Sequence, residues 1–215
     1  MIYTMYDYLS KYSDTLSEII ALAEIDNYSF DYIEKNIAYS IPFSNFENSN
    51  ITDIAFTSSS KLYKLMFPNG KATLNDISIF GQAYWIGETY IRLFLKYRLS
   101  FEALFTYLPL EVMHSQFDLY HEMDASQFDK YFESLLKENP LSIFLKKKKM
   151  NSVDLANKTN ISISTIRSLK EGKRDLNKLQ ATYLEKIATS LGIKMKSLLR
   201  PLNLEIEEQK EIENW

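Results

Sequence analysis

Cysteine is absent from this chain of 215 residues, and glycine and proline occur only five times each. Without cysteine the protein can form no disulfide and offers no thiolate ligand to a metal ion, which suits a reducing cytosol. Because residues that break regular structure are scarce, helices are favoured over a turn-rich β fold.

Long hydrophobic runs are also missing. No stretch approaches the roughly 18 uninterrupted apolar residues of a membrane span. The N-terminal stretch "MIYTMYDYLSKYSDTL" has no basic start and no long apolar run, so the sequence predicts no signal peptide. These absences predict a cytoplasmic protein with no membrane partner. The longest apolar candidate, residues 77–99, is interrupted by Gln82, Glu88, Arg92, Lys96 and Arg98.

Charge is unevenly distributed, although the net charge is only −3. Residues 1–140 hold 10 lysines and arginines against 19 aspartates and glutamates, a net charge of −9. Residues 141–200 hold 14 against 4, or +10, and residues 201–215 hold 1 against 5, or −4. A compact basic segment beside an acidic body is typical of a polyanion-binding module. A solvated charged face is the alternative, and the motif within the segment makes it less favoured.

The first 139 residues have the periodicity of helices, and we expect an all-α fold. Residues suited to a helix start precede most of the expected helices. These helices cover 14–25 after Ser13, 30–40 after Ser29, 57–67, 75–99, 101–108 after Ser100, 110–123 opened by Pro109, and 125–136 after Asp124.

Two parts of this region carry further expectations. Residues 43–57 stay undecided between a loop and a short strand. In the predicted helix 75–99, Gly81, Ala83 and Gly87 are small, so we expect a neighbouring helix to pack closely there.

The best domain boundary is "KENP", residues 137–140, where composition and charge change and the residue before a proline resists helix. We expect a helical domain over 1–139 that dimerises or binds a partner, a basic domain over 140–200, and an acidic tail over 201–215. A free tail is favoured. The alternatives are a tail that folds back over the basic domain, or a dimer contact anchored by Trp215.

Residues 151–175 have the pattern of two short helices joined by a tight turn. Asn151 is a suitable N-cap, and "SVDLANKT" forms about two helical turns with Leu155 and Ala156 directed inward. Asn160 stands where a left-handed backbone conformation is needed, which Asn tolerates better than most residues other than glycine.

The second of these helices, "ISTIRSLKE", follows at once. We expect Ile161 to fill the angle between the helices, Ser162 to cap the second one and Gly172 to end it. Ile166 and Leu169 should face the core. A short helix held at a steep angle suits entry of its N-terminal end into the major groove of DNA. Residues 179–199 should supply closing helices with Leu184, Ile187, Ala188, Leu191, Ile193 and Leu198 in the core.

The segment 143–199 resembles the Cro/CI, or Xre-type, helix-turn-helix family. The matching pattern is "LAxxxxISxSTIxxLxxGKR…LxKIAxSLGI…LL". This resemblance implies operator binding by a domain of five helices, usually as a dimer on a near-palindrome. The chain departs from the family's pattern at Lys170, where an acidic residue is usual, and at Asn160, where the turn residue is usually glycine.

The resemblance also implies which residues contact DNA. Arg167 is the best single base reader because an arginine can bind guanine O6 and N7 together. A phosphate contact or a surface ion pair with Glu171 is the alternative for this residue. Base-facing positions are Ile163, Ser164, Arg167 and Ser168. Phosphate-facing positions are Asn151, Ser152, Ser162, Lys173 and Lys178, and the basic cluster adds Lys170 and Arg174.

Histidine occurs only at positions 114 and 121. His114, Asp118 and His121 are spaced so that one helix face could present all three as a metal set or an acid/base pair. One helix with no second ligand segment is a weak site, and His121 suits a hydrogen bond to the last carbonyls of a helix. We therefore expect no metal, no cofactor and no enzymatic activity.

The stretch "AYWIGETYIRLFLKYRLSFEALF…YHEMD" is similar to small helical proteins encoded beside bacterial toxin genes. That similarity implies an antitoxin-like domain that binds a protein partner. The aromatic residues Tyr84, Trp85 and Tyr90 belong to this stretch, and they are expected in the core, with some exposed to a partner.

Together these patterns predict a sequence-specific transcriptional regulator that binds an operator in double-stranded DNA as a homodimer and represses its own promoter. A toxin is the leading protein partner, which would make the chain an antitoxin. The alternative is a protein–protein inhibitor of a phage or host effector that uses its helix-turn-helix only for autoregulation. A helical domain that has lost DNA binding is disfavoured because "LKKKK" lies beside the motif.

Overall fold

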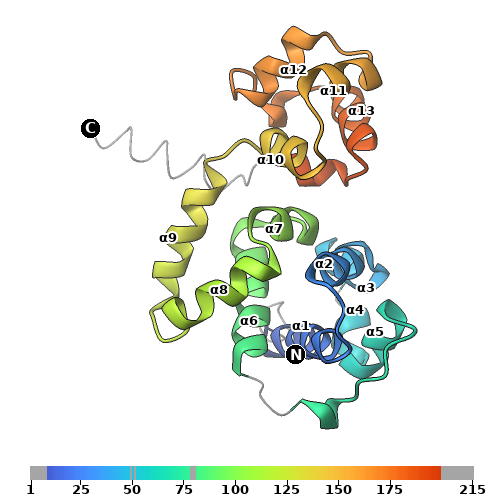
Figure 1. Cartoon of the computed structure of the whole chain (residues 1–215), viewed down its shortest axis with the longest axis vertical. Helices are drawn as coiled ribbons and strands as arrows, with labels where there is room; N and C mark the ends of the chain where they lie inside the picture. The colour runs from blue at the N-terminus through green and yellow to red at the C-terminus, as the bar shows by residue number, and fades with distance from the viewer. Residues whose placement is uncertain (1–8, 49, 51, 78–80, 200–215) are drawn as a thin grey trace, which may run out of the picture. The chain divides into compact units, whose positions relative to one another are not determined.

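The computed structural model describes residues 9–48, 50, 52–77 and 81–199, and every regular element in these ranges is a helix (Figure 1). The all-α fold expected from the sequence is confirmed. The chain divides into two compact units between Phe128 and Asp129. No helix of the described ranges is both long enough and apolar enough to cross a membrane. The expected acidic tail lies outside the described residues.

The first unit consists of α-helices and the short 3-10 helix η2. In chain order they are α1 (Leu9–Ile25), α2 (Phe30–Tyr39), α3 (Ile41–Glu47), α4 (Thr52–Phe56), α5 (Ser59–Met66), η2 (Leu74–Asp76), α6 (Gly81–Tyr97), α7 (Phe101–Tyr107) and α8 (Leu110–Tyr120). Helix α9 (Ala125–Leu136) begins in the first unit and ends in the second. The second unit continues with α10 (Pro140–Lys147), α11 (Ser152–Thr159), α12 (Ile163–Lys170), η3 (Leu176–Lys178), α13 (Ala181–Leu191) and η4 (Met195–Leu198).

Helices α1 and α6 form the most extensive helix pair of the first unit. The close approach expected at Gly87 is confirmed, because a Cβ atom there would lie 2.7 Å from the amide nitrogen of Ser17 and 3.0 Å from the carbonyl oxygen of Ser13. The same expectation is wrong at Gly81, whose Cβ would meet no atom within 4 Å. The apolar face of α1 is fully buried, as its spacing predicted, with Leu16, Ile19, Ile20, Leu22 and Ala23.

The predicted start of the first helix is wrong. Helix α1 begins at Leu9, so Ser13 lies inside it, and its side chain is buried rather than capping. The reason is that the apolar stripe continues one turn further, to Tyr12, which is fully buried and packs against Phe46.

Residues 43–57, expected as loop or strand, instead contribute to α3 and α4. Ser40 caps α3 by accepting a hydrogen bond from the amide of Phe43, and Pro42 lies in the first turn, where proline is favoured. The side chains of Asn45 and Asp53 join the two helices by a hydrogen bond of 2.7 Å. Short helices of this length carry too little periodicity to be recognised in the sequence alone.

The predicted helix 75–99 is also shorter in the structure, where α6 spans Gly81–Tyr97. Asp76 belongs to the short 3-10 helix η2 and not to α6. Its carboxylate accepts hydrogen bonds from the amide and hydroxyl of Thr73 at 2.7 and 2.8 Å. Local hydrogen bonds of this kind allow an aspartate side chain to compete with formation of a longer helix. Here they stabilise the 3-10 helix η2. Residues 78–80 lie outside the described residues.

The remaining helix starts lie close to the predicted positions. Ser29, Ser100 and Asp124 directly precede α2, α7 and α9, and the Asp124 carboxylate accepts a hydrogen bond from the amide of Ser126 at 2.8 Å. Pro109 precedes α8 by one residue, so it occupies the cap position rather than the first turn. A carboxylate distant in sequence, that of Glu34, accepts the amide of Leu110 at 2.8 Å.

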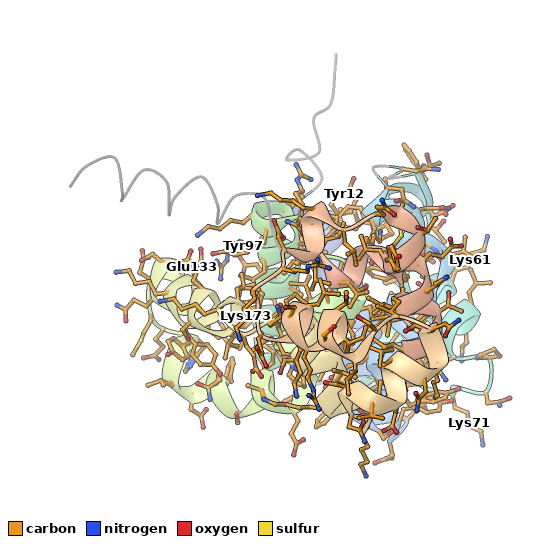
Figure 2. All side chains as sticks on the ribbon, turned by 90° about the horizontal axis from the view of Figure 1, so that it is seen from above. Tyr12, Lys61, Lys71, Tyr97, Glu133 and Lys173 are labelled. Carbon is orange, nitrogen blue, oxygen red and sulfur yellow. The ribbon has the colours of Figure 1, made fainter. Side chains whose placement is uncertain are left out.

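Further long-range bonds hold the helix ends of the first unit together. The Glu47 carboxylate accepts the amide of Phe101 at 2.7 Å, and Asp26 accepts the amides of Lys71 and Ala72 at 2.6 and 3.0 Å. Each bond satisfies an amide that no helix or strand partner would otherwise accept. The side chains of Lys61 and Lys71 project outward from the unit (Figure 2).

We predict that Gly87→Ala destabilises the first unit by about 1–3 kcal/mol, because the added methyl group has no room between α1 and α6. Urea denaturation followed by the fluorescence of Trp85, with Trp215 replaced by Phe, measures this unit. Gly81→Ala is the matched control, and it should be neutral or slightly stabilising because its methyl group meets open space. Equal stability of the two variants would contradict the close approach.

Candidate nucleic-acid interface

The start of α11 is held by a reciprocal capping box. The side-chain oxygen of Asn151 accepts hydrogen bonds from the amides of Val153 and Asp154 at 2.8 and 2.9 Å. The Asp154 carboxylate in turn accepts the amide of Asn151 at 3.1 Å. Asn151 is therefore the N-cap that the sequence predicted, and its cap satisfies amides that the helix leaves without partners.

The turn between α11 and α12 has the predicted left-handed residue. Asn160 has φ 58° and ψ 31°, and the Thr159 hydroxyl donates to the carbonyl of Leu155 at 2.7 Å while it accepts the amide of Ile161 at 3.3 Å. Ile161 is buried between the helices, as predicted. This turn is short because one left-handed residue reverses the chain directly after the helix.

Helix α12 is fixed at both ends. The Ser162 hydroxyl accepts the amide of Thr165 at 3.2 Å, which confirms the predicted cap. At the other end, the side-chain amide of Asn139 donates to the carbonyl of Leu169 at 2.9 Å. Gly172 has φ 71° and follows the helix in the left-handed conformation that glycine adopts without strain.

One hydrophobic cluster holds α11 and α12 at their angle. Ile166 and Leu169 of α12 and Leu155 of α11 are fully buried in it, as the sequence predicted. Ile193, predicted in the core, is only partly buried against it. The buried members are Leu141, Phe144, Leu145, Leu155, Ala156, Ile161, Ile166, Leu169, Leu176, Leu184, Ile187, Ala188, Leu191 and Leu198.

The four predicted base-facing residues differ in exposure. Ser164 and Arg167 are exposed, whereas Ile163 and Ser168 are half-buried, and Ile163 packs against the hydrophobic cluster. On a helix, positions 164, 167 and 168 share the face opposite Ile166 and Leu169, while Ile163 lies at its side. The outward face of α12 therefore centres on Ser164 and Arg167.

Arg167 does not form the ion pair that was its alternative. Among the described residues, its guanidinium has no hydrogen bond or ion pair, while Glu171 pairs with Lys173 at 2.7 Å. The hydrogen bond from Lys173, together with its charge, lowers the pKa of the Glu171 carboxyl. The direct partner of Glu171 is thus Lys173. The positive charge of Arg167 makes a smaller contribution to the lowered pKa of Glu171, without a direct ion pair.

Most of the predicted phosphate-facing residues are exposed. Asn151, Ser162, Lys170 and Arg174 are exposed, and Ser152 is half-buried. Lys173 and Lys178 make exposed ion pairs, with Glu171 at 2.7 Å and with Asp175 at 3.8 Å. Exposed pairs of this kind contribute little to stability, so a phosphate can replace the carboxylate at little cost.

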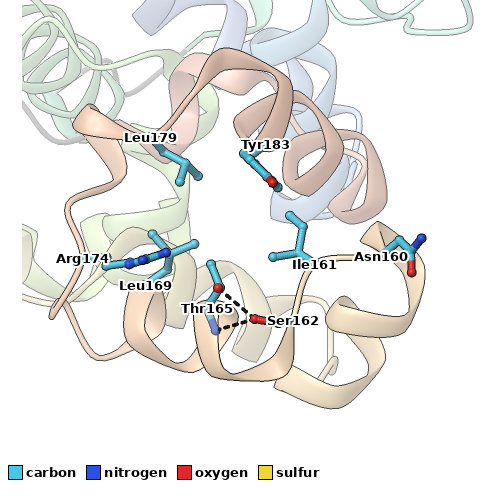
Figure 3. A pocket seen from close by; sticks show the side chains of 8 residues that line it. All are labelled: Asn160, Ile161, Ser162, Thr165, Leu169, Arg174, Leu179 and Tyr183. Carbon is cyan, nitrogen blue, oxygen red and sulfur yellow. Dashed lines mark hydrogen bonds between the residues drawn. The ribbon is translucent and has the colours of Figure 1, made fainter.

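A pocket of about 240 Å³ lies between α12 and α13, and sequence reasoning did not identify it (Figure 3). Arg174 is the one predicted site residue with a charge in its lining. Thr165 and Tyr183 also line the pocket, and neither was among the predicted site residues. The lining residues are Asn160, Ile161, Ser162, Thr165, Leu169, Arg174, Leu179 and Tyr183.

The histidines take part in different contacts in the first unit. His114 Nε2 lies 2.7 Å from Glu24 Oε1, and its ring stacks on Phe30. His121 follows α8, where Nδ1 lies 2.8 Å from the carbonyl oxygen of Phe117. This contact is the helix-end hydrogen bond expected for His121. The described part of the chain contains no group of three His, Cys, Asp or Glu side chains placed to hold a metal ion.

Comparison with protein families identifies the second unit. Residues 140–201 match the model of the Cro/C1-type HTH DNA-binding domain. A search of curated proteins and a search of solved structures found no match. The predicted helix-turn-helix resemblance is therefore confirmed for the C-terminal part, whereas the resemblance of the N-terminal part to antitoxins is not confirmed. A domain of this type supports a DNA-binding regulator in general.

We predict that Asn160→Ala destabilises the second unit by about 1–2 kcal/mol, because alanine is strained in the left-handed conformation. Asn160→Gly is the matched control, which should keep or raise stability since glycine adopts this conformation freely. Thermal denaturation of both variants, with DNA affinity measured below the transition, checks the prediction. An alanine variant as stable as the glycine variant would show that the backbone at position 160 is not constrained.

Proposed function

We propose that this chain, which carries a Cro/C1-type helix-turn-helix domain at residues 140–201, is a sequence-specific regulator that represses its own promoter. The observation that carries the proposal is the outward face of α12, where Ser164 and Arg167 are exposed on a helix fixed at both ends. The proposed mechanism is steric, since a dimer bound at the promoter blocks polymerase.

The dimensions of α12 suit the major groove. Its eight residues make a helix of roughly 12 Å, and the groove is about 12 Å wide. Arg167 has a guanidinium that is free among the described residues, and it can bind guanine O6 and N7 together. We assign it the main base contact, with Ser164 and Ser168 beside it and Ile163 at the edge of the contact.

The surrounding charges suit the DNA backbone. Residues 141–200 carry a net charge of +10. Lys170 lies in α12, Lys173 and Arg174 follow it, and Lys178 ends η3. Asn151, Ser152 and Ser162 lie at the starts of α11 and α12, where backbone amides can bind an anion. We propose these residues as the phosphate contacts. A homodimer would place two such faces on half-sites about 34–36 Å apart.

A second candidate function is inhibition of a protein, either a toxin or a phage or host effector. It is favoured by exposed apolar side chains in the first unit, because Ile41, Phe56 and Leu65 are 74, 77 and 63% exposed. In this case the chain would be an antitoxin or inhibitor, and DNA binding would serve autoregulation. We propose no enzymatic activity for either function, and we propose the cytoplasm as the compartment because the DNA target lies there.

The decisive experiment measures binding of the full-length protein to its own upstream DNA and to a scrambled duplex, by fluorescence anisotropy across a salt series. We expect the upstream duplex to bind at least about a thousandfold more tightly. Log affinity should fall linearly with log salt, with a slope of about −0.9 for each phosphate contact. Equal and weak binding to both duplexes would contradict operator recognition and favour the protein-inhibitor function.

The role of Arg167 is tested in the same assay. We predict that Arg167→Ala lowers the preference for the upstream duplex by about 1–3 kcal/mol, because a bidentate base contact is lost. Lys130→Ala is the control, since it removes one exposed positive charge from α9, outside the matched domain. A uniform loss on both duplexes, with a salt slope reduced by about one, would assign Arg167 to a phosphate instead.

The second candidate makes a separate prediction. Replacing Ile41, Phe56 and Leu65 by serine should leave the molar mass in solution and the operator affinity unchanged, because these side chains would serve another protein. Light scattering after size-exclusion chromatography measures the mass. A change from dimer to monomer would assign the three side chains to self-association and remove the observation that favours the inhibitor.

A further inference from the structure

We propose that the pocket between α12 and α13 binds a small organic anion, a phosphate monoester or carboxylate with a compact apolar group, and that the bound anion competes with DNA. The competition rests on the proposed function, whereas anion binding does not. The pocket would make DNA binding responsive to a metabolite of this class.

The pocket combines an apolar floor with polar walls. Ile161 and Leu169 are buried and Leu179 is half-buried, so they form an apolar surface that needs no hydrogen-bond partner. The walls come from different elements, with Arg174 from the loop after α12 and Tyr183 from α13 (Figure 3). A ligand with a short apolar body and one polar end matches this division.

Two donors face the pocket from opposite sides. Figure 3 shows the side chains of Arg174 and Tyr183 on different sides of the pocket that both of them line. Within the ranges that the structure describes, neither group has a hydrogen-bond or ion-pair partner. Both are therefore free to donate to a ligand.

No carboxylate lines the pocket to neutralise Arg174. The adjacent carboxylate, that of Asp175, accepts the amide of Asn177 at 2.8 Å and lies 3.8 Å from the ammonium of Lys178. The pocket therefore has a net positive charge. An arginine forms its strongest hydrogen bonds with carboxylate or phosphate oxygens, and the Tyr183 hydroxyl can donate to the same group.

The size of the pocket limits the ligand. Its volume of about 240 Å³ is below the range of about 300–1,000 Å³ that is usual for drug-sized ligands. A phosphate or carboxylate attached to a single small ring or a short chain fits this volume. A whole dinucleotide does not.

The pocket shares groups with the proposed DNA contacts. Arg174 is a proposed phosphate contact, and Ser162, which caps α12, lines the pocket as well. One guanidinium cannot hold a small anion in the pocket and a backbone phosphate outside it with full strength. An occupied pocket should therefore weaken DNA binding.

The test uses the isotopically labelled full-length protein and phenyl phosphate as the probe, followed by amide shifts in two-dimensional NMR spectra. Chloride at matched ionic strength and phenol are the reference titrants. We expect saturable shifts at Ile161, Thr165, Leu179 and Tyr183 with phenyl phosphate only. Affinity should fall at least tenfold in Arg174→Gln and severalfold in Tyr183→Phe. It should stay unchanged in Lys158→Gln, which removes an exposed charge from α11 outside the lining.

Non-saturating shifts, or binding that Arg174→Gln leaves intact, would overturn the proposal. Loss of DNA affinity in Arg174→Gln without saturable phenyl phosphate binding would also overturn it, because the pocket would then serve the DNA backbone alone. The competition is measured separately, as an increase of at least threefold in the Kd for upstream DNA when phenyl phosphate saturates the pocket at constant ionic strength. An unchanged Kd would overturn the competition.

These results are independent of operator recognition. If the protein does not distinguish its upstream DNA from the scrambled duplex, the proposed autorepression fails. Saturable binding of phenyl phosphate would still establish the pocket as an anion site in that case, because no duplex is present in the NMR titration.

Discussion

The left-handed turn at Asn160 is the constraint on which the proposed DNA-binding surface depends. It reverses the chain within one residue, so Ile161 can enter the core and Ser162 can cap the next helix. The resulting angle places Ser164 and Arg167 outward while Ile166 stays buried. A different backbone conformation at this position would move the whole outward face of α12, because the helix is short and has no other connection to α11 than this turn and the shared core.

The positive side chains of the second unit are available to bind a polyanion. Lys173 and Lys178 have carboxylate partners, but both pairs are exposed and contribute little to stability. The guanidinium groups of Arg167 and Arg174 have no hydrogen-bond or ion-pair partner among the described residues. Binding of DNA would therefore replace weak pairs and fill free donors instead of breaking strong interactions, and its strength would depend on salt.

The first unit differs in how its polar groups are used. Carboxylates such as Glu34 and Glu47 accept amides at the starts of distant helices, so part of its negative charge is committed to the fold. Some of its apolar side chains, Ile41 and Phe56 among them, are largely exposed to solvent. These exposed side chains are the basis of the proposed protein partner, while the second unit contains the match to the Cro/C1-type HTH DNA-binding domain.

Sequence alone determined the local features of this protein, because caps and turns depend on neighbouring residues. Asn151, Ser162 and the left-handed Asn160 were predictable from residue type and spacing, and the helix-turn-helix followed from them. Tertiary structure alone decided the burial of Ser13, whose helix extends through Tyr12. It also decided the pocket, since Arg174 and Tyr183 come from different elements and only packing brings them to one cavity.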